Sequence, residues 1–179
     1  LTVIVTAMVT LAFTAIMWRV GLRYKLYPEI RERDVHTTPK PRIGGVAMYL
    51  GVLAAFALSS QVPYFSIIWT DPSRNWSIMA AATLIVIVGV VDDLWDLDWM
   101  IKLGAQFLAA GIVVGFGGIQ IYYLPVGTQL AVSSWVGFAV SVLAIVIVMN
   151  AVNFIDGLDG LVAGVALISN VVFFVYTYI

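Results

Sequence analysis

The chain has 179 residues, of which 62% are hydrophobic and only 11% are charged. A soluble domain has about 45–50% apolar and about 25% charged residues, so this composition excludes an ordinary water-soluble globule, a disordered tail and a nucleic-acid binder. The mean hydropathy of +1.02 indicates a chain that lies in a bilayer. The sequence has no cysteine, which excludes disulfides, zinc–thiolate sites and cysteine nucleophiles.

Apolar runs without charge predict membrane-spanning helices, six in chain order. They cover residues 1–18, 43–60, 76–91, 100–117 and 134–150, with a sixth that begins near Leu161. No charge lies between Lys102 and Asp156, a stretch too long for one helix of about 20 residues, so its polar middle is expected to be a loop. We therefore expect an all-α fold, a polytopic transmembrane helical bundle, with one membrane domain over residues 1–179. The chain opens without Met and its last apolar run continues to Ile179, so we expect a fragment of a longer protein.

The distribution of Lys and Arg predicts which side of the membrane each loop faces. Seven of these nine residues lie between Arg19 and Arg42, and basic loops stay in the cytoplasm. The N-terminus is then expected outside, with inside loops at 19–42, 92–99 and 151–160 and outside loops at 61–75 and 118–133. All six Trp fall at or near predicted span ends, where amphipathic rings prefer to lie.

Acidic residues gather on one predicted side of the membrane. Of the ten Asp and Glu, only Asp71 is expected outside, and the other nine lie on the three inside segments. A purely structural membrane subunit has no evident need for this convergence. We therefore look for a site on the cytoplasmic surface.

The first inside loop ends in a stretch with prolines and paired glycines, Arg31–Gly45. The prolines favour an extended loop, and the glycines allow close approach of a ligand or backbone. His36, Lys40 and Arg42 would form a compact set of donors suited to phosphate. An anchor that merely sets membrane orientation is the alternative, and it accounts well for the other basic residues of this loop.

The second stretch holds two adjacent carboxylates directly after an apolar span. Asp92 and Asp93 repel each other and favour water or a cation, which suggests metal or acid–base chemistry. We interpret Asp96 and Asp98 as part of a solvated loop that stops the helix. Lys102, about one turn into the next helix, would reach the interface, the Asp pair or a bound phosphate.

The third stretch, Asn150–Gly160, combines two Asn with two Asp-Gly pairs at the end of a span. Asn153, Asp156 and Asp159 follow an i, i+3, i+6 spacing, which in a helix places them on one stripe. A helix cap followed by a turn explains one Asp-Gly but not the whole run, so a functional site is favoured. Several glycines are instead expected to be close-packing positions: Gly104, Gly111, Gly115, Gly157, Gly160 and Gly164.

Together these stretches resemble the polyprenyl-phosphate N-acetylhexosamine-1-phosphate transferases of glycosyltransferase family 4. The matching motifs are H-x-x-P-x-P-R-x-G-G at 36–45, the Asp pair at 92–93, Lys102 with Gln106, and N-A-V-N-F-I-D-G-L-D-G at 150–160. The Pro-x-Pro-Arg form resembles the UDP-GlcNAc branch more than the related phospho-MurNAc-pentapeptide translocase. The Arg33-Asp34 pair departs from the family's usual Arg-Lys, and the family's further essential Asp and His-containing loop would lie beyond Ile179.

The resemblance implies an enzyme that transfers a sugar-1-phosphate from a UDP-sugar, with UDP-GlcNAc expected, to undecaprenyl or another polyprenyl phosphate, releasing UMP. This reaction starts a cell-envelope glycan, and the enzyme would be a multi-pass protein of the bacterial inner membrane with its active face in the cytoplasm. Mg²⁺ is the implied cofactor, with Mn²⁺ as a substitute, and a homodimer is a further expectation. Asp92, Asp93 and Asp156 would be catalytic, and Asn153 with Asp156 would hold the metal. The implied substrate-binding residues are His36, Lys40, Arg42, Lys102 and Asp159.

Other functions would leave different patterns. A peptidoglycan-type phospho-MurNAc-pentapeptide transferase is the alternative within the same family. A fragment of an ion-coupled transporter would carry acids near the membrane midplane, whereas these acids cluster at one interface. A CDP-alcohol phosphotransferase needs a longer Asp-Gly-x-x-Ala-Arg pattern that this chain lacks.

Overall fold

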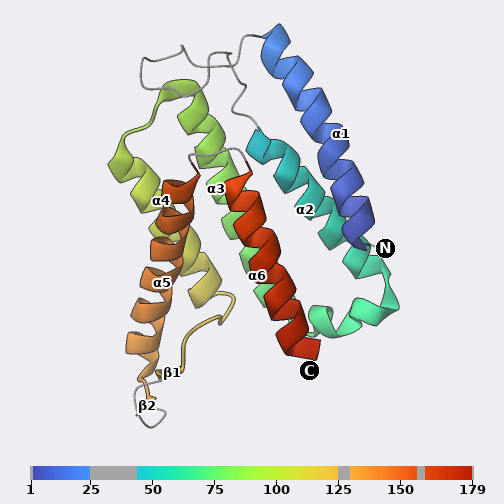
Figure 1. Ribbon diagram of the computed structural model, residues 1–179. Helices are drawn as coiled ribbons and strands as arrows, with labels where there is room; N and C mark the ends of the chain where they lie inside the picture. The colour runs from blue at the N-terminus through green and yellow to red at the C-terminus, as the bar shows by residue number, and fades with distance from the viewer. Residues whose placement is uncertain (1, 25–43, 125–129, 157–159, 179) are drawn as a thin grey trace. The chain divides into compact units, whose positions relative to one another are not determined.

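The computed structural model describes residues 2–24, 44–124, 130–156 and 160–178. Six α-helices account for most of them, together with one 3₁₀ helix and a pair of two-residue antiparallel strands (Figure 1). In chain order the elements are α1 Thr2–Arg23, α2 Gly44–Gln61, η1 Pro63–Thr70, α3 Pro72–Trp95, α4 Trp99–Gly115, β1 Tyr123–Leu124, β2 Leu130–Ala131, α5 Ser134–Ile155 and α6 Leu161–Tyr178. They group into two compact units, Leu1–Ile119 and Gln120–Ile179, and each is considered by itself. The expectation of a single membrane domain stays a prediction.

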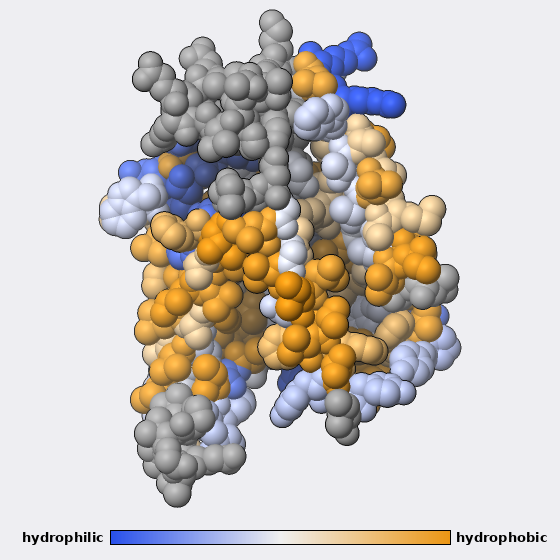
Figure 2. Space-filling view, viewed as in Figure 1, coloured by the Kyte–Doolittle hydropathy of each residue, from blue (hydrophilic) through white to orange (hydrophobic). Residues whose placement is uncertain are grey.

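The all-α transmembrane class is confirmed. Five described helices, α1, α2, α3, α5 and α6, are long and apolar enough to cross a membrane. The fourth expected span is α4, whose 17 residues lie at the lower end of the length that spans a bilayer, about 17–25 residues. Large apolar side chains cover the helix surfaces in Figure 2, and the buried hydrophobic residues are few and mostly small. Such a surface is suited to lipid rather than to water.

Several helices extend past the predicted spans into polar sequence. α1 continues to Arg23, α3 through Asp92 and Asp93 to Trp95, and α5 through Asn153 to Ile155. Hydropathy marks where hydrocarbon ends, whereas the helical hydrogen-bond ladder continues until a residue leaves helical geometry. The Asp pair is therefore helical and not part of a loop.

α1 and α2 pack through small residues. Ala47 of α2 is fully buried, and Gly51, one turn later, is also buried. A Cβ built on Gly51 would overlap Thr10 Oγ1 and lie 3.2 Å from Thr10 Cβ and 3.4 Å from the Thr6 carbonyl oxygen. Small residues spaced four apart allow helix backbones to approach closely in a membrane, where no hydrophobic force drives the helices together.

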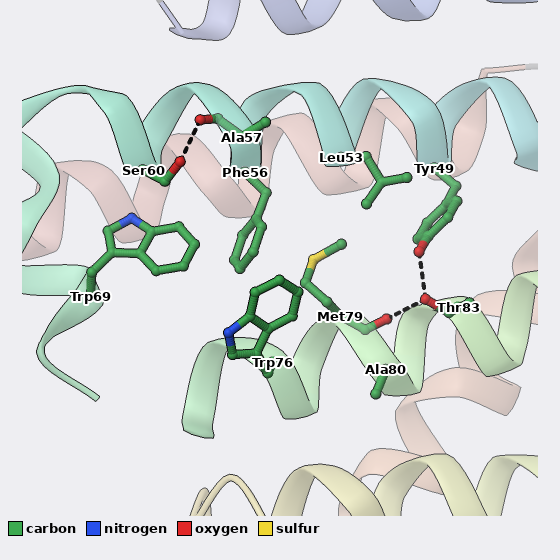
Figure 3. A pocket seen from close by; sticks show the side chains of 10 residues that line it. All are labelled: Tyr49, Leu53, Phe56, Ala57, Ser60, Trp69, Trp76, Met79, Ala80 and Thr83. Carbon is green, nitrogen blue, oxygen red and sulfur yellow. Dashed lines mark hydrogen bonds between the residues drawn. The ribbon is translucent and has the colours of Figure 1, made fainter. Parts of the chain in front are cut away.

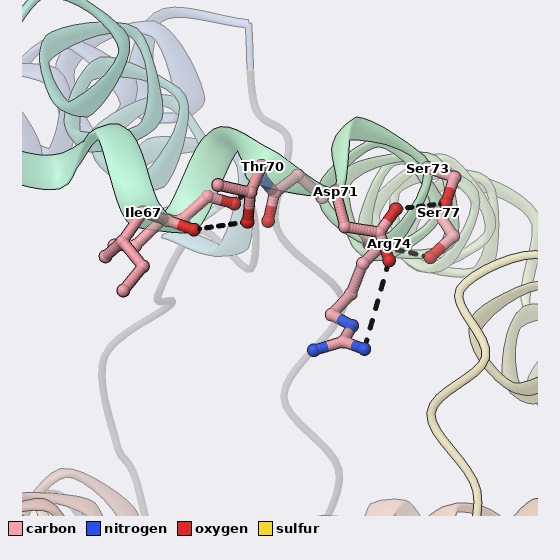
Figure 4. A network of polar contacts seen from close by, with 8 residues as sticks. Ile67, Thr70, Asp71, Ser73, Arg74 and Ser77 are labelled. Atoms are coloured by element: carbon pink, nitrogen blue, oxygen red, sulfur yellow. Dashed lines mark hydrogen bonds and ion pairs between the residues drawn. The ribbon is translucent and has the colours of Figure 1, made fainter.

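A polar network fixes the short segment between α2 and α3. The Asn75 amide donates to the Ile68 carbonyl at 2.7 Å and ties η1 to the first turn of α3. At the α3 start, the Ser73 hydroxyl donates to Asp71 Oδ1 at 2.5 Å, and Arg74 lies 3.9 Å from Asp71 Oδ2 (Figure 4). The Ser73 hydrogen bond holds the pKa of Asp71 below its ordinary value.

The second unit is built on α5. The Ile121 amide donates to Ser141 Oγ at 2.7 Å, and the Ser141 hydroxyl donates in turn to the Gly137 carbonyl. A Cβ on Gly137 would lie only 2.6 Å from the Ile121 carbonyl oxygen. Gly137 and Ser141 therefore seat the segment that leads into β1 against the start of α5, away from the α5–α6 junction.

The close-packing expectation is wrong at four of the six glycines and stays a prediction at Gly115. A Cβ at Gly104, Gly111, Gly160 or Gly164 would meet no described atom within 4 Å. Close approach occurs instead at Gly51, at Gly137 and at Gly117, where a Cβ would overlap Ser77 Oγ and the Val113 carbonyl oxygen. Whether a glycine packs closely depends on the neighbouring helix, which spacing within its own helix does not specify. Gly157 lies outside the described residues.

These contacts give a stability prediction for the α1–α2 interface. Gly51→Ala should destabilise the complete protein by about 1–3 kcal/mol, because overpacking forces Thr10 or the helix to move. Gly111→Ala should be neutral or stabilising by up to about 1 kcal/mol, because alanine favours the helix and no described atom opposes its Cβ. Thermal unfolding in detergent measures both.

Adding Thr10→Ala to Gly51→Ala removes the overlapping hydroxyl and should recover most of the lost stability. Equal melting temperatures for the two glycine variants would contradict the packing described for α1 and α2.

Candidate functional site

The α3–α4 turn is a tight helical hairpin built by aspartates. Asp96 ends α3 in the left-handed conformation, with φ 50° and ψ 69°, and its amide donates to the Asp92 carbonyl at 2.8 Å. Asp98 begins α4 as its N-cap, and its carboxylate accepts from the Met100 amide at 2.8 Å. Asp and Asn tolerate the left-handed region and satisfy the free amides of a helix start. The interpretation of Asp96 as a helix-stopping residue is confirmed, whereas Asp98 does not stop a helix but begins the next one.

Within this hairpin the Asp92 carboxylate is held by donors from two directions. The Leu97 amide donates to Asp92 Oδ1 at 2.9 Å. Lys102 Nζ, from α4, lies 3.1 Å from Oδ1 and donates to Oδ2 at 3.3 Å. The side chains are 29% exposed for Asp92 and 37% for Lys102, so the pair lies at an accessible edge. The sequence left three partners open for Lys102: the membrane interface, the Asp pair or a bound phosphate. In the structure Lys102 contacts the Asp pair, at Asp92.

Asp93 occupies a different face of α3 from its neighbour. Adjacent helical residues point about 100° apart, so Asp93 is exposed while Asp92 turns toward α4. Gln106 follows Lys102 by one turn on α4 and is partly buried. The hairpin thus presents the Asp92 carboxylate, the exposed Asp93 carboxylate and the Lys102 ammonium group close to the turn that joins α3 to α4.

A second polar group lies at the end of α5, in the other unit. Asn150 and Asn153 belong to its last two turns, and the Asn150 amide donates to the Val146 carbonyl at 2.8 Å. Asp156 is the C-cap, and its backbone amide contacts the Asn153 carbonyl at 3.4 Å. Asn153 and Asp156 are exposed. Because α5 ends at Ile155, Asp156 lies just beyond the helical stripe predicted for it.

The remaining predicted site residues, His36, Lys40, Arg42 and Asp159, lie outside the described residues. In the first unit, the end of α1 and the start of α2 lie at the same end as the α3–α4 turn, opposite η1 (Figure 1). Among the described residues, no three His, Asp or Glu side chains gather into a group that could hold a metal ion.

Sequence reasoning missed one group of this site, the Leu97 backbone amide. An amide leaves no signature in the sequence. The available signal was the Asp-Leu-Asp spacing between two apolar runs, which is typical of a helix end followed directly by an N-cap.

The first unit also contains an apolar pocket of about 540 Å³ between α2, η1 and α3 (Figure 3). Its wall includes Tyr49, Phe56, Trp69, Trp76, Met79 and Thr83. Phe56 contacts both indoles, with ring centroids 4.6 Å from Trp69 and 5.8 Å from Trp76. The Tyr49 hydroxyl bonds to that of Thr83 at 2.5 Å. No lining residue carries a charge, so the pocket offers none of the cationic groups that phosphate chemistry needs.

Comparison with curated proteins finds relatives named as polyprenyl-phosphate N-acetylglucosamine phosphate transferases. The chain is 37% identical over 166 residues to the decaprenyl-phosphate N-acetylglucosaminephosphotransferase of Mycobacterium leprae, covering 91% of this chain and 42% of that protein. It is 32% identical to a probable undecaprenyl-phosphate N-acetylglucosaminyl 1-phosphate transferase of Bacillus subtilis, covering 92% of this chain and 44% of that protein. The corresponding α-N-acetylglucosaminyl transferase of Yersinia pestis is 28% identical, over 89% of this chain and 42% of its own length.

The chain thus spans about two fifths of the length of the curated relatives it matches. No solved structure matches it. A family model described as glycosyl transferase family 4 matches residues 75–179, which include the α3–α4 hairpin and the Asn150–Gly160 motif. With this match over more than half of its residues, the chain belongs to glycosyl transferase family 4.

Proposed function

We propose that this chain is part of an enzyme that transfers N-acetylglucosamine-1-phosphate from UDP-GlcNAc to a polyprenyl phosphate and releases UMP. The structural observation that carries the proposal is the Asp92 carboxylate, held beside Lys102 and next to the exposed Asp93 at one end of a transmembrane hairpin. The names of the relatives support the sugar phosphate and the lipid acceptor.

The proposed reaction exchanges one phosphoanhydride bond for another. An oxygen of the lipid phosphate attacks the phosphorus that bears the sugar, a new P–O bond forms, and the bond to the UMP oxygen breaks. Nucleophile and electrophile are both anions, so the site must place cationic and hydrogen-bonding groups around the transferring phosphoryl group. Lys102 is a described cation beside this site, and His36, Lys40 and Arg42 are the proposed further donors.

The two carboxylates of the hairpin fit different tasks. Asp92 accepts from Leu97 and Lys102 and therefore keeps a fixed orientation, suited to position or deprotonate the attacking lipid phosphate. Asp93 is exposed and supports the same phosphate or the metal. Asp159, near the α5–α6 junction in sequence, is proposed for the nucleotide.

Mg²⁺ is the proposed cofactor, and the donor chemistry at the end of α5 fits it. Mg²⁺ prefers oxygen ligands and is usually bound by one or two carboxylates together with substrate phosphates and water. Asp156 offers a carboxylate and Asn153 an amide oxygen, and both are exposed. When bound, the ion would neutralise charge on the diphosphate. Mn²⁺ meets the same oxygen donors and is the proposed substitute.

The membrane setting supports the lipid acceptor. A site at the surface of a helical membrane protein reaches a phosphate in the headgroup layer while the prenyl chain stays in the hydrocarbon. The basic residues between Arg19 and Arg42 favour the cytoplasmic face of the inner membrane, where a nucleotide sugar would be available. A homodimer is proposed for the complete enzyme.

The rival functions are less well supported. Each relative described above is named for N-acetylglucosamine, which favours that sugar over phospho-MurNAc-pentapeptide. A transporter would need acids near the membrane midplane, whereas Asp92 and Asp156 lie in the last turn of α3 and just after α5.

Substitution of the acids tests the assignment of the site. In the complete protein, Asp92→Asn and Asp156→Asn should each lower kcat for UMP release by about 10²-fold or more, because each removes a charge that acts on the transferring phosphoryl group. Asp98→Asn is the matched control and should retain activity, because asparagine caps a helix as well as aspartate does.

UMP release with polyprenyl phosphate in membranes measures these rates, and thermal unfolding verifies that each variant is folded. Full activity in the Asp92 and Asp156 variants would show that the acids have been assigned wrongly.

Removal of divalent cations tests the cofactor. EDTA should abolish UMP release, and Mg²⁺ or Mn²⁺ should restore it, whereas Ca²⁺ should restore less because its longer, flexible coordination fits a compact diphosphate poorly. Undiminished release in chelator, with metal analysis showing no retained ion, would exclude the proposed magnesium.

A further inference from the structure

The α3–α4 hairpin contains an unusual backbone position that neither the motif nor the proposed reaction explains. Asp96 is the one non-glycine residue with a positive φ in the described part of the chain, at φ 50°. L-residues avoid this region because Cβ approaches the carbonyl oxygen, and Gly, Asn and Asp tolerate it best. Asp96 follows the Asp pair by one helical turn, and the two helices reverse direction directly after it.

This conformation determines where the next amide points. The Asp96 amide still completes a helical bond to the Asp92 carbonyl at 2.8 Å. The left-handed residue then turns the chain back, so the Leu97 amide meets the Asp92 side chain at 2.9 Å, five residues earlier. A right-handed or extended Asp96 would aim that amide elsewhere.

The Leu97 amide and Lys102 divide the two oxygens of Asp92 between them. Oδ1 accepts from Leu97 and is also the nearer oxygen to Lys102 Nζ, at 3.1 Å. Oδ2 has one donor among the described residues, Lys102 Nζ at 3.3 Å. Each oxygen of Asp92 thus accepts one hydrogen bond, and the carboxylate cannot rotate without losing the Leu97 amide.

We propose that Asp96 is a positioning residue for the transfer reaction, acting through its left-handed backbone, which holds the Leu97 amide on Asp92 Oδ1 and so fixes the orientation of the Asp92 carboxylate. The inference rests on the proposed function for its effect on rate. Its structural part, the placement of the Leu97 amide, stands on the geometry alone.

The test compares substitutions that keep or lose the left-handed conformation in the complete protein. Asp96→Gly and Asp96→Asn both accommodate it and should keep kcat within about threefold of wild type. Asp96→Val should lower kcat by about 10- to 100-fold, because a β-branched residue disfavours positive φ and misplacement of a reacting group is costly. Because only the reacting carboxylate moves, KM for UDP-GlcNAc should change by less than about threefold.

Leu94→Val is the matched control. It places valine two residues earlier, on an exposed position where α3 is helical, and should leave both kinetic constants unchanged. Melting temperatures establish that all variants are folded.

Hydrogen exchange provides a measurement that does not depend on activity. The Leu97 amide should exchange at least about tenfold faster in Asp96→Val and in Asp92→Ala than in wild type. Asp92→Ala removes the carboxylate that accepts its hydrogen bond, and Asp96→Val turns the amide away from that carboxylate. Asp96→Gly should retain the wild-type protection.

The outcomes separate the two proposals. Wild-type kcat in a folded Asp96→Val variant would overturn the positioning role while leaving the transferase intact. An equal loss in Asp96→Gly and Asp96→Val would overturn it as well, since the side chain and not the backbone would then be responsible. A wild-type protein without transferase activity would refute the proposed function, and the exchange rates would still decide whether Asp96 positions the Leu97 amide.

Discussion

A carboxylate at the edge of a membrane helix needs donors, and at Asp92 these donors come from the turn that joins α3 to α4. The Leu97 amide and the Lys102 ammonium group both reach the same side chain, one from the turn and one from the next helix. Neither contact exists unless the hairpin closes in this geometry. The hydrogen bonds that orient the acid are thus also bonds that hold the two helices in register at this end.

This coupling matters because few large apolar side chains are buried elsewhere in the first unit, so burial does little to fix the arrangement of its helices. The buried hydrophobic residues are few and mainly Ala, Val and Met, and most large apolar side chains face outward, where lipid would cover them. Close contacts therefore depend on small residues, such as Gly51 against Thr10 and Gly117 against Ser77, and on polar bonds such as Asn75 to Ile68. Membrane helices generally associate in this way, since lipid removes the hydrophobic force that packs soluble helices.

Much of the fold could be predicted from the sequence because hydropathy and helical spans share one physical cause. The predicted spans locate each long helix of the described residues, although α3 and α5 extend past the apolar runs, because hydrogen bonding continues into Asp92, Asp93 and Asn153. The direction of Lys102 could not be chosen in advance, since it depends on how α4 meets α3. The close-packing glycines were predicted at the wrong positions for the same reason: the neighbouring segment determines which glycine is closely approached. The left-handed Asp96 and the Leu97 amide are backbone features that residue types alone do not reveal.

The proposed chemistry is based on the small number of charged residues in the chain and on their positions at helix ends. A helical membrane protein with 11% charged residues has placed a carboxylate pair, an ammonium group and an Asn–Asp cap at helix ends near the membrane surface. Under the proposed function, phosphoryl transfer between two anions at that surface would use all of these groups, whereas a purely structural role accounts only for the Asp92–Lys102 contact and the Asp156 cap.

The most direct test follows the β-phosphorus of the donor. The complete protein in vesicles would receive UDP-GlcNAc labelled at the β-phosphate, together with polyprenyl phosphate and Mg²⁺. Transfer of a sugar-1-phosphate predicts that the label enters the lipid fraction with an equal amount of unlabelled UMP released. Label that remains water-soluble as UDP while sugar enters the lipid, or no incorporation at all, would contradict the proposed transferase.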